Sequence, residues 1–108
     1  MATTWKHAER RIAALLSGRR VPVTGRARGD APDVSAPGLA VEVKHRAALP
    51  AWLLTALAQA EAAAEGDQLP VAVLHGAGGR YADALVVVRL RDFARLLAAW
   101  TAWHGGDP

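Results

Sequence analysis

A two-residue turn in the first half of the chain constrains the fold more than any other feature. The Pro-Gly pair at 37–38 is a turn signal, and it separates two strand-like segments, 32–36 and 39–44. A symmetric hairpin centred on this turn places Asp33 opposite Glu42, with Cβ atoms about 5 Å apart. The sequence therefore predicts an antiparallel hairpin in which two carboxylates face each other.

The second strand of this hairpin carries charge among apolar residues. Val41 and Val43 point to one face, so Glu42 and Lys44 share the other. Two facing carboxylates repel each other unless a cation lies between them, and hard oxygen ligands at this spacing suit Mg²⁺ or Mn²⁺. An ammonium group beside such a metal orients an attacking water or neutralises charge on a phosphate. Asp33, Glu42 and Lys44 together indicate phosphodiester hydrolysis; the alternative is a surface salt bridge on a half-exposed sheet.

Hydrophobic periodicity and turn residues divide the rest of the chain into helices and strands. Helices are predicted over 4–16, 50–65 and 92–103, and further strands over 19–23, 69–74 and 84–90. Thr4 caps the first helix and Gly18 ends it, while Pro50 opens the second. The order α-β-β-β-α-β-β-α, with a hairpin followed by a helical crossover, predicts one mixed sheet with helices packed on it. A length of 108 residues fits a single domain, 1–108, with a core over 4–103 and a frayed tail over 104–108.

The composition limits the class of protein. Hydrophobic residues make up 52% of the chain, enough for a packed core. The chain has no cysteine, which excludes disulfides, a thiolate nucleophile and sulfur-ligated zinc and fits a reducing cytoplasm. It shows neither the apolar run of a signal peptide at its start nor the roughly 20 apolar residues of a membrane span. We expect a protein of the cytoplasm, bacterial or of a phage-infected cell, without contact to a membrane.

Basic residues are concentrated in the first half of the chain. Residues 1–46 hold nine basic and four acidic side chains, a net +5, whereas residues 47–108 hold four basic and six acidic, a net −2. Arg26 and Arg28 belong to a glycine-containing loop, 24–31, that leads to the hairpin. A basic half suits a polyanion, and the arginine fork matches phosphate with two hydrogen bonds. The alternative is an ordinary solvated surface, and charge alone does not decide between the two.

The spacing of the hairpin residues resembles a known catalytic signature. Pro32-Asp33, eight further residues and then Glu42-Val43-Lys44 resemble the motif of the PD-(D/E)XK nuclease superfamily. The resemblance covers residues 4–90 and extends to the order of elements. It implies a restriction-endonuclease-like α/β fold, a mixed β-sheet flanked by helices. It also implies that Asp33 and Glu42 bind Mg²⁺, with Mn²⁺ able to substitute, and that Lys44 assists the attacking water.

Within that superfamily the chain is similar to the archaeal-type Holliday junction resolvases and their phage relatives. Those enzymes carry a glutamate followed by an arginine on the first helix, and Glu9-Arg10 occupies that place here. The resemblance implies that Glu9 is a third metal ligand; a pair with Lys6 on a solvated helix face is the alternative. DNA contacts are predicted for a set of polar loop and helix residues: Arg10, Thr24, Arg26, Arg28 and Gln59. For Gln59 the alternative is an exposed polar position on an alanine-rich helix.

These observations predict a Mg²⁺-dependent endodeoxyribonuclease that resolves four-way DNA junctions as a homodimer. A junction has two-fold related strands, so a symmetric dimer presents one site to each. Trp52, Trp100 and Trp103 supply aromatic surface for such a dimer, with core packing as the alternative. Two other functions stay open: a nuclease of the same superfamily acting on other DNA, of repair or restriction type, and a non-catalytic DNA-binding module. The glycine-rich segment 76–80 lacks the ending of a phosphate-binding loop and is predicted to be a flexible hairpin loop.

Overall fold

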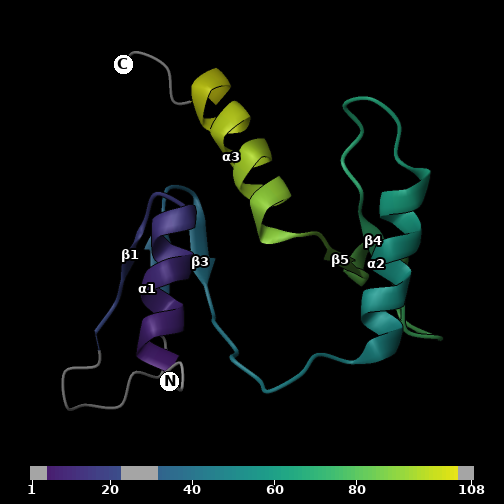
Figure 1. The fold of residues 1–108 in the computed structure, drawn as a ribbon, viewed down its shortest axis with the longest axis horizontal. Helices are drawn as coiled ribbons and strands as arrows, with labels where there is room; N and C mark the ends of the chain where they lie inside the picture. Colours follow the sequence, from purple (N-terminus) through teal and green to yellow (C-terminus); the bar gives the residue numbers. More distant parts are fainter. Residues whose placement is uncertain (1–4, 23–31, 105–108) are drawn as a thin grey trace. The chain divides into compact units, whose positions relative to one another are not determined.

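Helices and short antiparallel strands alternate along the chain, which is α/β in class. The structure is a computed structural model, and it describes residues 5–22 and 32–104 (Figure 1). The elements, in chain order, are α1 (Trp5–Leu15), β1 (Arg19–Arg20), β2 (Val34–Ala36), β3 (Leu39–Val41), α2 (Ala51–Ala63), β4 (Ala72–Leu74), the 3-10 helix η1 (Tyr81–Asp83), β5 (Leu85–Val87) and α3 (Leu90–His104). The predicted cap Thr4 and most of the predicted tail, 105–108, lie outside the described residues. None of the described helices has the length and the apolar character that crossing a bilayer requires.

The chain divides into two compact units, and each forms its own sheet. The first unit comprises residues 1–46 and 94–108, and the second comprises residues 47–93. The prediction of one mixed sheet is wrong for the described residues, which form a three-stranded sheet of order β1-β2-β3 and a two-stranded sheet β4-β5. Every strand pair in these sheets is antiparallel. Within each sheet, each strand pairs with the next strand along the chain, and the closing of a shorter connection costs less chain entropy than the closing of a longer one.

The hairpin of the first unit has the predicted register. Val34 pairs with Val41, which centres the turn between residues 37 and 38. Gly38 has φ +77°, a conformation that glycine adopts without the steric cost of a side chain. β1 lies on the other side of β2, with Arg20 opposite Val34. Each hairpin strand spans three residues, fewer than the sequence predicted, because regular pairing stops beyond Val34 and Val41.

α1 packs on β1 and β2 and forms the core of the first unit with them. The buried apolar side chains are short or of medium size: Ala13, Leu16, Val34 and Ala36. Val34 is the largest fully buried side chain among the described residues. Small side chains at this interface let the helix and the sheet approach closely, so little free volume remains between them.

The end of α1 depends on a glycine for a reason that the sequence does not reveal. Ser17 takes the left-handed conformation (φ +56°), and the N–H of Gly18 donates to the carbonyl of Ala13 at 2.9 Å, which closes the helix. Gly18 thus ends the helix, as predicted, and its missing side chain also allows close contact with β2. A Cβ at this position would overlap the carbonyl oxygen of Ser35 and lie 2.7 Å from the Cβ of Ala36.

The second unit is a helix packed on a hairpin. α2 begins directly after Pro50, as predicted, and the missing N–H of proline costs nothing at a helix start. Leu57 of α2 and Ala72 of β4 are buried, and the strands pair with Val73 opposite Val86. Both of these valines are more than half exposed, so one face of this hairpin is apolar and open to solvent.

An ion pair fastens α2 to the segment that follows β5. The guanidinium of Arg89 donates from Nε to Oε2 of Glu61 at 3.0 Å and from Nη2 to Oε1 at 3.4 Å. Arg91 adds a longer contact to the same carboxylate at 3.7 Å. The hydrogen bond from Arg89 lowers the pKa of Glu61, and the carboxylate in turn raises the pKa of Arg89.

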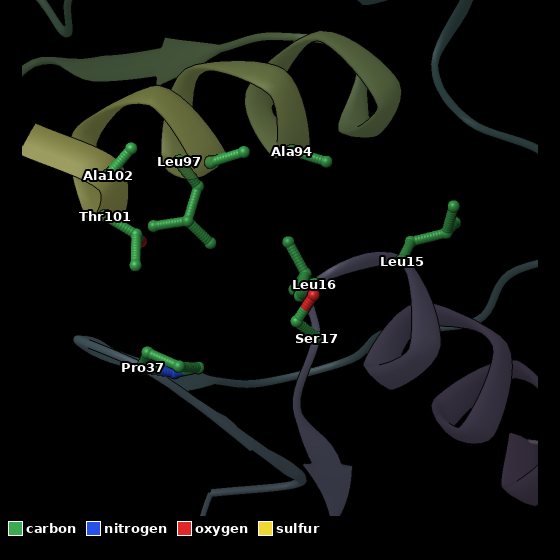
Figure 2. Close-up of a pocket in the computed structure, with 9 residues that line it drawn as sticks. Leu15, Leu16, Ser17, Pro37, Ala94, Leu97, Thr101 and Ala102 are labelled. Carbon is green, nitrogen blue, oxygen red and sulfur yellow. The ribbon is translucent and has the colours of Figure 1, made fainter. Parts of the chain in front are cut away.

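The later part of α3, from residue 94, borders a groove within the first unit. The groove encloses about 360 Å³ between the end of α1, the 37–38 turn and α3. Leu97 and Thr101 point from α3 into this space, and Leu16 and Pro37 border it from the other side (Figure 2). The packing of α3 is therefore incomplete, and its side chains Leu96, Trp100 and Trp103 are 50%, 49% and 83% exposed.

Substituting Gly18 tests the close approach between the end of α1 and β2. Gly18→Ala should lower the free energy of unfolding by about 1–3 kcal/mol, because the added methyl group forces β2 to move. Urea denaturation followed by circular dichroism measures this change. Gly76→Ala is the control, since a Cβ at Gly76 meets no atom within 4 Å. Equal stability of the two variants would contradict the close approach.

The pair between Glu61 and Arg89 makes stability depend on pH. Because the pKa of Glu61 is lowered by folding, its contribution is complete above the carboxyl's ordinary pKa and disappears as the pH falls through the lowered value. Glu61→Gln should therefore destabilise the protein at pH 7, and the difference from wild type should shrink in acid. The same substitution in an Arg89→Ala background is the control, where the pH-dependent difference should largely vanish. If the full pH-dependent difference in stability persisted in the Arg89→Ala background, it would come from a partner of Glu61 other than Arg89.

Candidate active site

Asp33 joins three strands at one end of the first sheet. Its backbone carbonyl accepts a hydrogen bond from the N–H of Val21 at 2.9 Å, which continues the pairing of β1 with β2. Its side-chain Oδ2 accepts a hydrogen bond from the N–H of Val43 at 2.7 Å, beyond the end of β3. The residue is 3% exposed, so this short charge-assisted bond satisfies a buried carboxylate. Asp33 therefore holds the segment that carries Glu42 and Lys44 against β2.

Glu42 and Lys44 lie together at the surface of the same sheet. The register of β2 and β3, continued by one residue, places Glu42 opposite Asp33. The Nζ of Lys44 lies 3.2 Å from Oε2 of Glu42, and both side chains are more than half exposed. Val43, between them, is half-buried, as expected from the alternation along a strand. An exposed pair of this kind contributes only about 0–1 kcal/mol to folding, so its geometry is not needed for stability.

Glu9 lies elsewhere, on the buried face of α1. Its Oε1 accepts a hydrogen bond from Nε of Arg20 at 2.6 Å, and the two side chains are 5% and 16% exposed. The guanidinium carbon of Arg20 also lies 5.4 Å from the ring centroid of Trp5, in cation–π geometry. The structure thus pairs Glu9 with Arg20 of β1, on the face of the sheet that α1 covers, whereas strand alternation directs the exposed Glu42 to the opposite face.

The described residues supply two carboxylates, not three, at the candidate site. Within residues 5–22 and 32–104 no three His, Asp or Glu side chains are grouped so that they could hold a metal ion. Asp33 and Glu42 nevertheless match the donors that Mg²⁺ prefers, since this ion is commonly held by one or two carboxylates together with water and substrate phosphate. The chemistry of this donor pair fits a divalent cation, with Lys44 as an adjacent positive charge.

The predicted DNA contacts are distributed over both units. Arg10 is exposed on α1, in the first unit. Gln59 is exposed on α2, in the second unit. Thr24, Arg26 and Arg28 lie outside the described residues. For all five the role in DNA binding stays a prediction.

Comparison of the chain with protein-family models, with curated proteins and with solved structures found no match. The likeness to the nuclease superfamily therefore stays a prediction from the sequence, based on the hairpin motif, on Glu9-Arg10 and on the predicted order of elements. What the site can do follows from the chemistry of these residues and their contacts.

Arg20 is the one residue near these carboxylates whose importance the sequence interpretation missed, because it was counted only as part of a basic half. A signal was present in the helical spacing. Glu9 and Ala13 of α1 and Leu16 just after it follow helical spacing and are buried, and α1 packs on the sheet. A carboxylate on a buried stripe needs a cationic partner, and β1 follows α1 directly with two arginines.

Removing Arg20 tests the buried ion pair. Arg20→Ala should lower the free energy of unfolding by about 3–5 kcal/mol, because it leaves the carboxylate of Glu9 buried without its partner. Urea denaturation measures the loss. Arg19→Ala, at the exposed neighbouring position, should change stability by less than about 0.5 kcal/mol. Replacing both members, Glu9→Leu with Arg20→Met, should recover most of the stability; no recovery would argue against a pairwise interaction.

Proposed function

We propose that this chain is a divalent-metal-dependent endodeoxyribonuclease whose catalytic residues are Asp33, Glu42 and Lys44. One observation supports it most: the carboxylate of Asp33 holds the N–H of Val43, and so fixes the segment bearing Glu42 and Lys44 beside it. This arrangement has a cost, because a carboxylate is kept buried at the end of a sheet. Phosphodiesterase chemistry explains an aspartate that positions a Glu-Val-Lys segment better than a surface salt bridge does.

Each residue has a role in the proposed reaction. Asp33 and Glu42 would hold Mg²⁺, or Mn²⁺ in its place, through carboxylate oxygens. The bound ion supplies Lewis-acid stabilisation of the phosphate and a more acidic water. Lys44 donates hydrogen bonds to the attacking water or to a phosphate oxygen, and its charge offsets the negative charge that develops there. Its 3.2 Å contact with Glu42 keeps the ammonium beside the ligand set.

The proposed role of Glu9 differs from that of Asp33 and Glu42. As a third metal ligand its carboxylate would have to leave Arg20, to which it is bonded at 2.6 Å. A buried charge-assisted bond of this length favours a supporting role, in which Glu9 holds β1 against α1. We therefore assign the metal to Asp33 and Glu42 and keep Glu9 as a ligand that only a rearranged site would use.

DNA is the proposed substrate because of the distribution of charge. Residues 1–46 carry a net +5, and they include the candidate active site. Among the described residues of this segment Arg10 is exposed and available to phosphate. Thr24, Arg26 and Arg28 are proposed contacts from the loop before Asp33, and Gln59 from α2. Counterion release at these basic residues would supply most of the affinity.

The finer proposal is a homodimer that resolves four-way junctions. One chain carries a single candidate site, so paired nicks on two strands need two copies. Trp52 in the second unit and Trp100 and Trp103 in the first are 63%, 49% and 83% exposed, so each of them is available to contacts between copies of the chain. A nuclease of repair or restriction type that acts on other DNA is the alternative within the same chemistry. The exposure of the Glu42–Lys44 pair also agrees with a non-catalytic DNA-binding module.

Substitution at the site separates catalysis from binding. Asp33→Asn, Glu42→Gln and Lys44→Ala should each reduce cleavage by at least about 100-fold, because several kcal/mol of transition-state stabilisation are lost. Asparagine keeps an acceptor for the N–H of Val43, so the fold should persist. Cleavage of labelled junction, flap and linear DNA with Mg²⁺ or with a chelator gives the rates, and gel shift gives the affinities, which should stay within about 3-fold.

Glu65→Gln, an exposed substitution in the second unit, is the matched control and should leave cleavage unchanged. Wild-type rates in all three site variants would contradict the catalytic assignment and leave the binding module. Light scattering decides the oligomeric state, and a monomer that cuts junction and linear DNA equally would overturn the junction-resolving part of the proposal.

A further inference from the structure

The loop between β4 and β5 contains several hydrogen bonds of its own. The N–H of Gly79 donates to the carbonyl of Gly76 at 2.9 Å, and Gly78 supplies the left-handed conformation (φ +84°) that the turn needs. Two further backbone bonds, of 3.1 Å each, form the 3-10 helix η1. The ring of His75 adds a bond from Nε2 to the carbonyl of Gly79 at 2.8 Å. The segment 76–80, predicted to be a flexible hairpin loop, does connect two paired strands, and it contains internal hydrogen bonds.

Two aromatic rings are stacked on this loop and exposed to solvent. The rings of His75 and Tyr81 have centroids 4.3 Å apart and planes inclined by 19°. Tyr81 is nevertheless 84% exposed, the highest value among the large hydrophobic side chains of the described residues. One face of the Tyr81 ring therefore rests on His75, while much of the remaining ring surface is open. The stack adds nothing to the core of the second unit.

We propose that the His75–Tyr81 stack is a platform for an unpaired nucleobase of DNA. Each nucleobase presents a planar face that stacks on an aromatic side chain, and His75 holds the tyrosine ring before the base arrives. Bases inside a duplex are already stacked on their neighbours and present only their edges. The platform therefore selects single-stranded DNA, or DNA with unpaired bases, over fully paired DNA. This inference rests on the proposed function, since it assumes that DNA is the ligand, and it narrows the substrate class.

The charges on the loop explain why stacking, not phosphate attraction, would provide the binding energy here. Arg80 precedes Tyr81 and Asp83 ends the 3-10 helix, so the exposed segment 75–84 has no net charge when His75 is neutral. A loop without net charge releases few counterions, so its contribution should be nearly independent of salt. That distinguishes the platform from the basic first half of the chain, whose contribution should weaken steeply with salt.

The experiment uses the full chain and two probes in the presence of a chelator, so that nothing is cut. The probes are a single-stranded oligonucleotide containing one 2-aminopurine and the same strand in a blunt duplex. Tyr81→Ala should weaken single-strand binding by about 5- to 150-fold, the range for loss of one stacked base. It should also abolish the quenching of 2-aminopurine fluorescence, and duplex affinity should change by less than about 2-fold.

Tyr81→Phe keeps the aromatic ring and should bind the single strand and quench the probe like wild type. If the hydroxyl were responsible for binding, this variant would show the defect of Tyr81→Ala. Leu85→Ala is the matched control, because Leu85 is 65% exposed next to the loop and has no aromatic face. The single-strand defect of Tyr81→Ala should be the same at low and high salt.

Several results would overturn the platform. They are wild-type protein that does not quench the probe, Tyr81→Ala that binds like wild type, and a defect of equal size on single strand and duplex. None of these measurements requires cleavage, so the platform and the proposed catalysis fail separately. Quenching by a protein that never cuts would remove the nuclease and keep the platform. Loss of cutting in Glu42→Gln, together with wild-type single-strand binding and quenching in Tyr81→Ala, would keep the nuclease and remove the platform.

Discussion

A buried carboxylate holds together the end of the first sheet. Asp33 accepts the N–H of Val21 through its backbone and the N–H of Val43 through its side chain, so it continues the pairing on both sides of β2. A peptide group could satisfy only one of these neighbours, whereas a carboxylate reaches the second. The position of Glu42 and Lys44 depends on this bond because regular pairing ends at Val41. The residue that the candidate chemistry most needs is therefore also one that the local fold needs.

Two of the ion pairs among the described residues, Glu9–Arg20 and Glu61–Arg89, differ in what they contribute to stability. Glu9 and Arg20 are almost fully buried between α1 and β1, so the loss of one partner leaves an uncompensated charge in the core. Glu61 and Arg89 are partly exposed, and solvent screens their attraction. The first pair specifies how a small helix sits on a small sheet. The second links α2 to the segment after β5, and its contribution to stability depends on pH.

Burial among the described residues is limited, and apart from Asp33 the groups that carry the functional proposals are exposed. Six apolar residues among those described are buried, whereas thirteen large hydrophobic side chains are exposed. Some of this exposed surface is expected of any small protein. The Tyr81 ring differs from it because a stacked partner and a hydrogen-bonded loop hold it in place. An exposed side chain that is held in place by its neighbours fits a preorganised binding surface better than incidental exposure does.

The sequence by itself determined the local features. The hairpin turn, the register that brings Asp33 opposite Glu42, the pairing of Glu42 with Lys44 and the start of α2 after Pro50 all follow from turn chemistry, strand alternation and backbone geometry over a few residues. Element ends were less predictable. The predicted strand 84–90 ends at Val87, and its last residue, Leu90, begins α3, whose first turn is closed by bonds to the carbonyl of Arg89.

Only the tertiary structure decided which distant groups meet. Arg20 pairs with Glu9 because α1 covers that face of the sheet, and strand pairing within each unit replaces the mixed sheet that the order of elements suggested. Gly18 is required by the carbonyl of Ser35, a contact across seventeen positions that no local pattern contains. Local periodicity specifies which face a residue occupies. What lies against that face depends on packing between elements, and short-range patterns carry no information about it.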